Sequence, residues 1–255
     1  MMWTLAWLLF ASLGLAVTHA AEARFAGRMT WFPSLRIMLR HSDQALSAYL
    51  LETADREFNH PHAGITALRP PLRPSPSPTP KGFKANSRRQ RLGTGIEVYH
   101  RAVRKGLREQ GVVNSLSWAD MVVAQPDARR WTEGMGLLTV VKCYGLLWSA
   151  NPCRLVFAHW DKKLPRELGK GRYSSIGFST VLGHLIAGEE RFSVEFRERD
   201  ASVWLDLYSV SKGSGVLGKV SMPFIRPIQK AFFAEQCRQM LRLTESDGEA
   251  TKKSN

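Results

Sequence analysis

Hydrophobic and polar residues alternate along the second half of this chain, and a period of two predicts β-strands. The alternation is clearest over 190–197, where Phe192, Val194 and Phe196 are separated by charged or small polar residues. We expect such a strand to bury its hydrophobic face and to expose its polar face to water. Stretches of the same kind predict further strands over 137–144, 154–160, 173–182 and 203–208.

Turn-forming residues stand between these predicted strands. Asn151-Pro152 is expected to join the first two strands, and Asp200-Ala201 the last two. Between the strands over 173–182 and 190–197 lie Gly183-His184 and Gly188-Glu189-Glu190, which predict a hairpin turn rich in ionisable groups. Strands that follow one another through short turns indicate an antiparallel sheet.

A period near 3.6 predicts helices on both sides of this sheet. Ser42 is a suitable N-cap for a short helix that ends at Leu51. A capping box over 94–97 predicts a second helix, which Gly111 ends. Its apolar stripe at helical spacing is Ile96, Tyr99, Val103 and Leu107. The longest helix is expected over 224–243, with a broad hydrophobic face and a cationic face. An early helix, an antiparallel meander and a long C-terminal helix together describe an α+β domain.

The first 41 residues have the composition of targeting sequences. Residues 1–21 are hydrophobic and contain no Asp, Glu, Lys or Arg, which predicts a signal peptide over 1–22 or an uncleaved membrane anchor. Residues 23–41 contain four arginines and no acid, a composition that resembles a transit peptide. Together these segments predict the secretory route or a plastid envelope as the location.

A proline-rich stretch over 69–80, RPPLRPSPSPTP, predicts a linker, since this composition cannot build a core. It separates an N-terminal part of the domain (42–68) from the main domain (81–245), and 246–255 is expected to be a disordered tail. The formal net charge is +14, and seven Lys or Arg residues without any acid lie in the basic region 69–91. No recognition motif accompanies this charge, so it favours an anionic surface such as a membrane over specific nucleic-acid binding.

Several kinds of catalytic and metal site lack their sequence signature. The chain has no G-x-S-x-G motif, and its three cysteines form no CxxC pair and no nucleophile motif. Cys143, Cys153 and Cys237 are interpreted as small buried hydrophobes, although a hairpin disulfide between the first two stays open. His60 and His62 have no further metal ligands around them in the sequence, so neither a metal nor a cofactor is predicted.

The ionisable groups of the predicted hairpin turn are the residues best suited to chemistry. His184 beside Glu189 or Glu190 has the functional groups of a general base, a metal site or a ligand contact. Alternatively, the glutamates bind backbone amides of the turn and His184 packs against it. Ligand contact is favoured over catalysis, and a structural role over both. Because adjacent strand residues point to opposite faces, at most one glutamate is expected to face a pocket.

A second set of candidates lies on the next predicted strand. Trp204, Asp206 and Tyr208 share one face, and aromatic rings that flank an acid form a polar anchor for a ligand or, equally, part of a core. Arg191 and Lys212 have the charge to neutralise an anionic head group. The predicted ligand contacts, with Trp148 at the opening, are His184, Glu190, Trp204, Asp206, Tyr208, Lys212 and Trp148.

Short motifs along the chain resemble the uncharacterised protein family 0548, a domain of unknown function found in plants and actinobacteria. The resemblance spans roughly residues 47–245, and its most specific block is Gly183-His184 followed by GEERF over 188–192. The other matching motifs are FNHPHAGIT (58–66), PKGF (80–83), RLGTG (91–95), NPCRLVF (151–157), Val203-Trp204 and SVSK (209–212).

The resemblance implies a fold similar to the START and Bet v 1-like helix-grip domains, in which a curved antiparallel sheet wraps around the C-terminal helix. Relatives of that architecture mostly bind apolar or amphipathic small molecules, and some cyclise or hydrolyse them. The preferred function is a noncatalytic binding domain for such a molecule. One alternative is a membrane-associated or pore-associated protein of the chloroplast envelope. The other is a cyclase-like or hydrolase-like enzyme that uses His184 with Glu189 or Glu190.

Overall fold

The computed structural model describes residues 35–37, 41–67, 79–109, 116, 118–123, 131–145 and 147–245. The predicted signal peptide or anchor, most of the transit-like segment, most of the proline-rich linker and the predicted tail lie outside the described residues.

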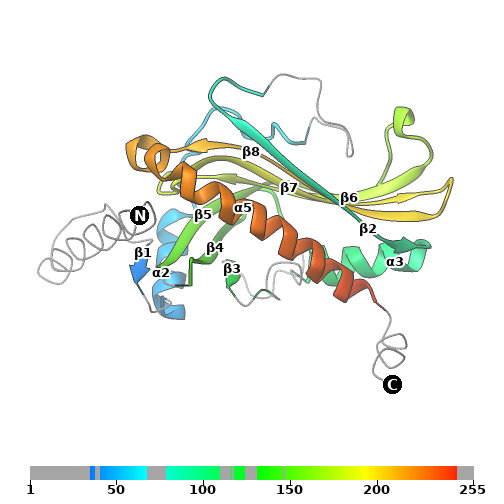
Figure 1. Ribbon diagram of the computed structural model, residues 1–255, viewed down its shortest axis with the longest axis horizontal. Helices are drawn as coiled ribbons and strands as arrows, with labels where there is room; N and C mark the ends of the chain where they lie inside the picture. Colours follow the sequence, from blue (N-terminus) through cyan, green and yellow to red (C-terminus); the bar gives the residue numbers. More distant parts are fainter. Residues whose placement is uncertain are drawn as a thin grey trace, which may run out of the picture.

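Among the described residues, one antiparallel sheet of eight strands forms the body of the molecule (Figure 1). Its strands are ordered β2-β8-β7-β6-β5-β4-β3, and β1 pairs with β5. Irregularities in the pairing of β2 and β5 bend these strands and increase the curl of the sheet. The strands are β1 (Leu35–Ile37), β2 (Lys84–Thr94), β3 (Ala119–Val123), β4 (Gly136–Cys143), β5 (Leu147–Lys163), β6 (Gly171–Thr180), β7 (Ile186–Arg197) and β8 (Ser202–Gly213).

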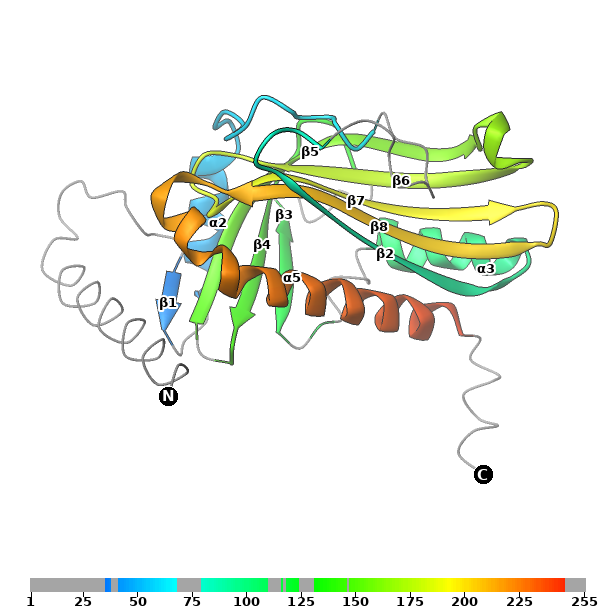
Figure 2. The same cartoon turned by 45° about the horizontal axis from the view of Figure 1, so that its top comes forward.

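The long C-terminal helix α5 (Gly215–Thr244) crosses the inner, concave face of this sheet (Figures 1 and 2). The helix α3 (Ile96–Arg101) continues into the π-helical turn η1 (Ala102–Arg108) on the same side of the sheet. A curved antiparallel sheet that holds a long C-terminal helix is the helix-grip arrangement, and the predicted α+β fold is confirmed. The remaining elements are α2 (Asp43–Thr53) and the 3₁₀ turn η2 (Arg166–Leu168).

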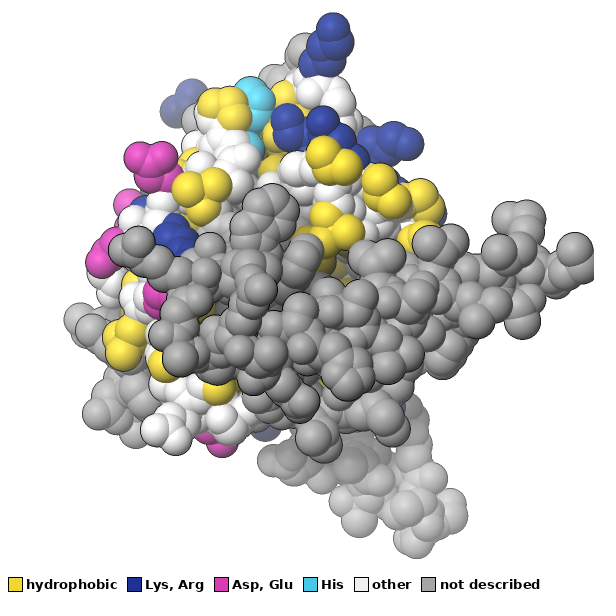
Figure 3. Space-filling view, turned by 90° about the vertical axis from the view of Figure 1, so that its left-hand side faces the viewer, with side chains coloured by type: hydrophobic (Ala, Val, Ile, Leu, Met, Phe, Trp, Pro, Cys, Tyr) yellow, Lys and Arg dark blue, Asp and Glu magenta, His cyan; other side chains and the backbone are white. Residues whose placement is uncertain are grey.

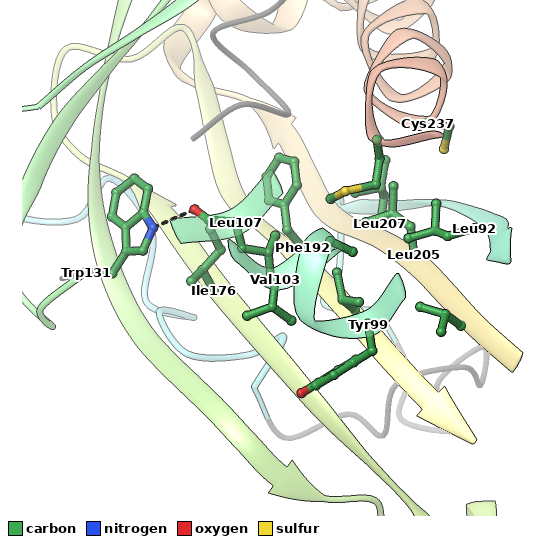
Figure 4. Close-up of a cluster of buried hydrophobic side chains, with 14 of the residues drawn as sticks. Leu92, Tyr99, Val103, Leu107, Trp131, Ile176, Phe192, Leu205, Leu207 and Cys237 are labelled. Carbon is green, nitrogen blue, oxygen red and sulfur yellow. Dashed lines mark hydrogen bonds between the residues drawn. The ribbon is translucent and has the colours of Figure 1, made fainter. Parts of the chain in front are cut away.

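The main core lies between the inner face of the sheet, α3, η1 and the last turns of α5 (Figure 4). The predicted stripe of Tyr99, Val103 and Leu107 is buried there, against Phe192 and Leu205 of the sheet. The indole N–H of Trp131 donates to the carbonyl oxygen of Leu107 at 2.9 Å, which satisfies a polar group inside this core. The hydrophobic side of the predicted alternation therefore faces the helices.

A smaller core holds α2 against the outer strands of the sheet. Leu46, Tyr49 and Leu50 pack with Leu138 and Val140 of β4. The hydroxyl of Ser42 accepts a hydrogen bond from the backbone N–H of Ala45, which confirms the predicted N-cap.

The opposite, outer face of the sheet is covered in part by a segment that connects α2 to β2, described over 58–67 and 79–83 (Figure 2). Arg191, Ser193 and Glu195 lie on this face and are buried. The prediction that the polar side of 190–197 is exposed to water was therefore wrong. Alternation shows which residues share a face, but it does not show that a distant segment covers the polar side.

Three further boundaries differ from the sequence prediction. Asn151-Pro152 lies inside β5, and the turn before β5 contains Tyr144 and Gly145, both at positive φ. Pro152 is tolerated because pairing with β6 begins only at Cys153, so its missing N–H leaves the β6 ladder intact. The hairpin turn before β7 comes at 182–185, since Gly188-Glu189-Glu190 already belongs to that strand.

Two helices also begin at other residues than predicted. Thr94 is the last residue of β2 and pairs with Ser202. The N-cap of α3 is Gly95, at φ 97°, which has no side chain to cap the helix. The predicted capping box was therefore wrong. The helix α5 begins nine residues before the predicted start, at Gly215, and contains Pro223 and Pro227. A proline removes one helical hydrogen bond, and here the helix continues through both.

The described part of the basic region 69–91 contains a strand that was not predicted. Its residues from Lys84 onward form β2, an edge strand that pairs with β8 alone. Lys84, Arg88 and Arg91 are exposed, as charged side chains often are on edge strands, where they discourage further pairing. The absence of alternation in this sequence concealed the strand.

Candidate functional site

The adjacent residues Glu189 and Glu190 of β7 point to opposite faces of the sheet. The outward carboxylate of Glu189 accepts hydrogen bonds from the backbone N–H of Gly64 at 2.5 Å and of Thr66 at 2.8 Å. The hydroxyl of Thr66 donates a third, at 2.5 Å. Burial raises the pKa of Glu189, and these three donors partly offset the shift. This glutamate fixes the covering segment to the sheet, which is the structural role considered from the sequence.

Glu190 points inward, beneath α5. Its strand partners on the inner face are Phe178 of β6 and Ser209 of β8. Asn86 of β2 lies next to Ser209 in the same cross-strand row, and Gln236 of α5 is close to Glu190. The three residues Asn86, Glu190 and Gln236 form what we call the inner polar cluster.

Several polar atoms of the inner polar cluster are buried without a hydrogen-bond partner among the described residues. Gln236 is 0 % exposed, yet neither its amide nitrogen nor its amide oxygen has a partner among the described residues. The Asn86 amide nitrogen and the Glu190 Oε1 atom are also buried and have no partner there. A buried polar group without a hydrogen bond reduces the stability of the folded state, because the same group is hydrogen-bonded to water in the unfolded chain. Four donor or acceptor atoms from three elements therefore converge on one place in the interior.

Burial also determines the charge of this cluster. It raises the pKa of Glu190 to about 8, a shift that the Gln236 amide partly offsets. The carboxyl group is then mostly protonated at neutral pH, so the cluster presents neutral donors and acceptors. Burial likewise raises the pKa of the nearby Cys153 thiol well above its ordinary range, which keeps the thiol unreactive.

The first half of α5 is less buried than its second half. Its inward side chains Met222, Ile225 and Gln229 are only half-buried, and no residue over 219–232 is fully buried. The last three turns, in contrast, bury Phe233, Cys237 and Met240 among other residues. Hydrophobic side chains at the start of the helix are strongly exposed, with Val216 at 81 % and Val220 at 68 %. Figure 3 looks at this end of the molecule, where hydrophobic side chains lie beside Lys and Arg side chains.

His184 lies in the turn between β6 and β7 and is held by its own neighbours. Its Nδ1 atom accepts a hydrogen bond from the backbone N–H of Ile186 at 2.9 Å, and its carbonyl oxygen lies 3.4 Å from the Asn59 amide nitrogen. Burial lowers the pKa of His184 to about 3, so the ring is neutral at physiological pH. Among the described residues, no hydrogen bond or ion pair joins His184 to Glu189 or Glu190.

Trp204, Asp206 and Tyr208 do share one face, as the alternation of β8 indicates, but it is the outer face. Asp206 accepts a hydrogen bond from Arg191 at 2.7 Å within a buried ion pair. Arg191 also donates to the carbonyl oxygen of Thr66, and its guanidinium lies 5.5 Å from the Tyr208 ring. These residues are therefore on the opposite side of the sheet from Glu190.

The last two predicted contacts are separate from both groups. The Lys212 ammonium lies 4.5 Å from the centre of the Phe83 ring, again on the outer face. Trp148 packs at the edge of the small core under α2, with the Lys142 ammonium 5.7 Å from its ring centre. Of the seven predicted contacts, only Glu190 lies in the inner polar cluster. A ligand role for the other six stays a prediction.

The sequence matches the model of a family described as a domain of unknown function, DUF1990, over residues 64–239. The chain belongs to this family. The match includes Asn86, Glu190 and Gln236, and it confirms the resemblance seen in the short motifs.

Similar curated proteins are named UPF0548 proteins, which is the family number of that resemblance. One from Arabidopsis thaliana is 29 % identical over 161 residues, 63 % of this chain and 73 % of that protein. One from Deinococcus radiodurans is 25 % identical over 164 residues, 64 % of this chain and 80 % of that protein.

The DUF1990 domain also has remote similarity to solved structures. Major latex-like protein 151 from Panax ginseng is 10 % identical, with a TM-score of 0.40, over 65 % of this chain and 99 % of that one. Norcoclaurine synthase from Thalictrum flavum, in complex with dopamine and hydroxybenzaldehyde, is 11 % identical, with a TM-score of 0.40. The match covers 65 % of this chain and 90 % of that one. These similarities are too remote to carry an inference about what the DUF1990 domain binds.

Two residues of the inner polar cluster were not predicted. Asn86 lies in the basic region 69–91, where no strand was predicted, and Gln236 lies within the hydrophobic face of the C-terminal helix. The signal for Gln236 was present, because a glutamine between Phe233 and Cys237 on the buried stripe of α5 is a polar residue in a core position.

The described part of the DUF1990 chain gives no sign of a metal site, since no three His, Cys, Asp or Glu side chains gather there as ligands would. His60 is instead held by Ser179 and by the carbonyl oxygen of Gly188. The three cysteines are free. None of the described helices combines the length and hydrophobicity needed to cross a membrane.

Proposed function

We propose that this protein binds an amphipathic small molecule between α5 and the inner face of the sheet. The polar end of the molecule contacts Asn86, Glu190 and Gln236, and its apolar part lies along the half-buried side chains of the first half of α5. The observation that carries the proposal is the set of four buried polar atoms that have no partner among the described residues, beneath a helix whose first half is only partly buried. Ligand sites commonly combine an apolar lining with a few convergent polar groups.

The charge of the inner polar cluster favours a neutral polar group on the ligand. With the pKa of Glu190 at about 8, the cluster offers a protonated carboxyl and two amides at neutral pH. Hydroxyl and carbonyl groups complement these donors and acceptors without the burial of a charge. A fatty alcohol is therefore expected to bind better than the corresponding fatty acid.

Binding is better supported than the enzymatic alternative. A cyclase or hydrolase of the kind considered from the sequence needs His184 as a base beside a carboxylate. The Nδ1 atom of His184 instead accepts a hydrogen bond from its own turn, and the Glu189 carboxylate receives three hydrogen bonds from the covering segment. The predicted secretory or plastid location, and with it the envelope alternative, depends on residues outside the described ones and stays a prediction.

The test uses the full chain and a fluorescent apolar probe, N-phenyl-1-naphthylamine, which is displaced by hexadecanol or palmitate. Hexadecanol is expected to displace the probe at lower concentration than palmitate. Gln236→Leu is expected to weaken hexadecanol about tenfold, because loss of a buried hydrogen bond costs about 1–1.5 kcal/mol. Native mass spectrometry after organic extraction identifies any molecule that copurifies.

Gln239→Leu is the matched control, since this glutamine is one turn away on the same helix and already donates to Glu235 at 2.9 Å. Its hexadecanol affinity is expected to equal that of the unmodified chain. The proposal is overturned if neither compound displaces the probe, or if both glutamine variants weaken hexadecanol equally.

A further inference from the structure

A second group of buried and partly buried polar residues lies on the outer face of the sheet, beyond the part that the 58–67 segment contacts. It consists of Ser193, Glu195 and Arg197, which alternate along β7, and of Arg89 on β2. Asp206 and Trp204 of β8 lie between them in two adjacent cross-strand rows. We call Arg89, Ser193, Glu195 and Arg197 the outer cluster. It spans three neighbouring strands, about 10 Å across.

The outer cluster contains a buried carboxylate that has no hydrogen bond among the described residues. Glu195 is 0 % exposed, and neither of its carboxylate oxygens has a hydrogen-bond partner among the described residues. Its nearest cation is Arg89, with Nη2 3.9 Å from Oε2, a separation too long for a hydrogen bond. Burial, and then the nearby charge of Asp206, raise the pKa of Glu195 well above its ordinary value. A buried carboxyl group in this state is one of the costliest groups that a fold can hold.

Donors without partners surround this carboxylate. Buried nitrogens of Arg89 (Nε and Nη2) and Arg197 (Nε), together with the Ser193 hydroxyl, have no hydrogen-bond partner in the described chain. The Arg89 guanidinium stacks 4.1 Å from the Trp204 ring centre, which holds it in place. Its side chain is still 30 % exposed, so the outer cluster is accessible along this edge.

The balance of charge indicates the class of ligand. Arg191 and Asp206 form an ion pair with each other, which leaves Arg89 and Arg197 beside the single carboxyl group of Glu195. This excess of positive charge attracts an anion, and planar guanidinium groups match carboxylate and phosphate oxygens. The Glu195 carboxyl and the Ser193 hydroxyl then require a further hydrogen-bonding group on the same molecule.

We propose that the outer cluster binds a small hydroxylated anion, such as a hydroxy acid or a sugar phosphate. Arg89 and Arg197 bind the anionic group, and Glu195 and Ser193 bind the adjacent hydroxyl group. This site is independent of the inner polar cluster because the sheet separates the two.

Isothermal titration calorimetry on the full chain tests the site with two pairs of probes. Glycerate is compared with propionate, and glycerol 3-phosphate with inorganic phosphate, because the second member of each pair lacks a hydroxyl on carbon. At least one hydroxylated probe is expected to bind tenfold or more tightly than its partner. Which of the two binds better distinguishes a carboxylate ligand from a phosphate ligand.

Variants then assign the binding to the named residues. Arg89→Leu is expected to weaken the preferred probe at least tenfold, and Glu195→Gln to remove most of the preference for the hydroxyl group. Arg88→Leu is the matched control, since it removes the same charge one residue away, from the opposite face of β2, and is expected to leave the affinity unchanged. Thermal unfolding by circular dichroism confirms that each variant is folded.

The proposal is overturned if no probe binds, if the hydroxylated probes bind no better than their partners, or if Arg88→Leu and Arg89→Leu weaken binding equally. The last result would indicate attraction to the overall positive charge alone. Hexadecanol binding is measured in parallel. If Arg89→Leu still binds hexadecanol with unchanged affinity, the result at the outer cluster is independent of the proposed site at the inner polar cluster.

Discussion

The covered part of the outer face and the inner polar cluster bury ionisable groups in opposite ways. On the outer face, Glu189 receives three hydrogen bonds from the 64–66 segment, and Arg191 pairs with Asp206. On the inner face, Glu190 lies one residue further along the same strand, and its Oε1 atom has no partner in the described part of the chain. Both glutamates have raised pKa values because of burial.

This difference distinguishes buried groups that stabilise the fold from buried groups that are available to a ligand. A carboxylate whose oxygens are satisfied by the protein has no capacity left for a ligand, and its loss damages the fold. A carboxyl group without partners costs stability, and its retention is explained if a bound molecule supplies the missing contacts. The following changes test this distinction.

The largest effect is expected when the buried ion pair of the outer face is broken. Asp206→Ala leaves the Arg191 guanidinium without its carboxylate and should reduce the free energy of unfolding by about 3–5 kcal/mol. In a chain of this size, the melting temperature should fall by roughly 10 °C. The exposed pair of Arg56 and Glu52 is the control, since Glu52→Ala should cost about 1 kcal/mol or less. Equal losses in the two variants would contradict the prediction.

Removal of the satisfied glutamate should have the next largest effect. Glu189→Ala leaves three donors of Gly64 and Thr66 unsatisfied and should reduce the free energy of unfolding by about 3 kcal/mol. Urea denaturation measures this loss, and limited proteolysis should cut sooner within 60–67. Glu189→Gln keeps one acceptor and should lose less. A variant that melts like the unmodified chain would show that Glu189 does not anchor the segment.

The unsatisfied glutamate should behave in the opposite way. The pKa of Glu190 is about 8 in the folded chain and near 4.5 when unfolded, so the folded state binds more protons between these values. Its contribution to stability is therefore lost as the pH rises from about 4.5 to 8. Glu190→Gln should remove this part of the pH dependence and be the more stable protein at pH 9, as measured by urea denaturation at a series of pH values. A constant difference between the two proteins would be inconsistent with a raised pKa.

The smallest effect at neutral pH is expected at the turn that precedes both glutamates. The pKa of His184 is about 3 in the folded chain against an ordinary 6.5, so protonation favours the unfolded state. Its contribution to stability is present above pH 6.5 and is lost as the pH falls toward 3. His184→Asn retains an acceptor for the Ile186 N–H and should differ by no more than about 1 kcal/mol at pH 7. It should resist acid better than the unmodified chain, and acid titration followed by circular dichroism measures this.

Much of the fold could be predicted from local patterns. Alternation located the strands around Phe178, Phe192 and Leu205, and helical spacing located Tyr99 and Leu107 on a buried stripe, because a side chain's face is set by backbone geometry alone. The strand β2 was missed because an edge strand rich in Arg and Lys has no alternation to detect. The early start of α5 was missed because Pro223, just before the predicted start, normally ends a helix.

The sequence by itself determined that Glu189 and Glu190 face opposite sides of a strand, since that follows from a period of two. It also determined the family, through motifs such as GEERF. Only the tertiary structure decided which glutamate is satisfied, because Gly64 and Thr66 are more than 120 residues away in the chain. It alone placed Asn86 and Gln236 beside Glu190, and Arg89 beside Glu195. Hydrogen bonds of buried groups depend on which distant segments cover each face of the sheet, and no local pattern contains that information.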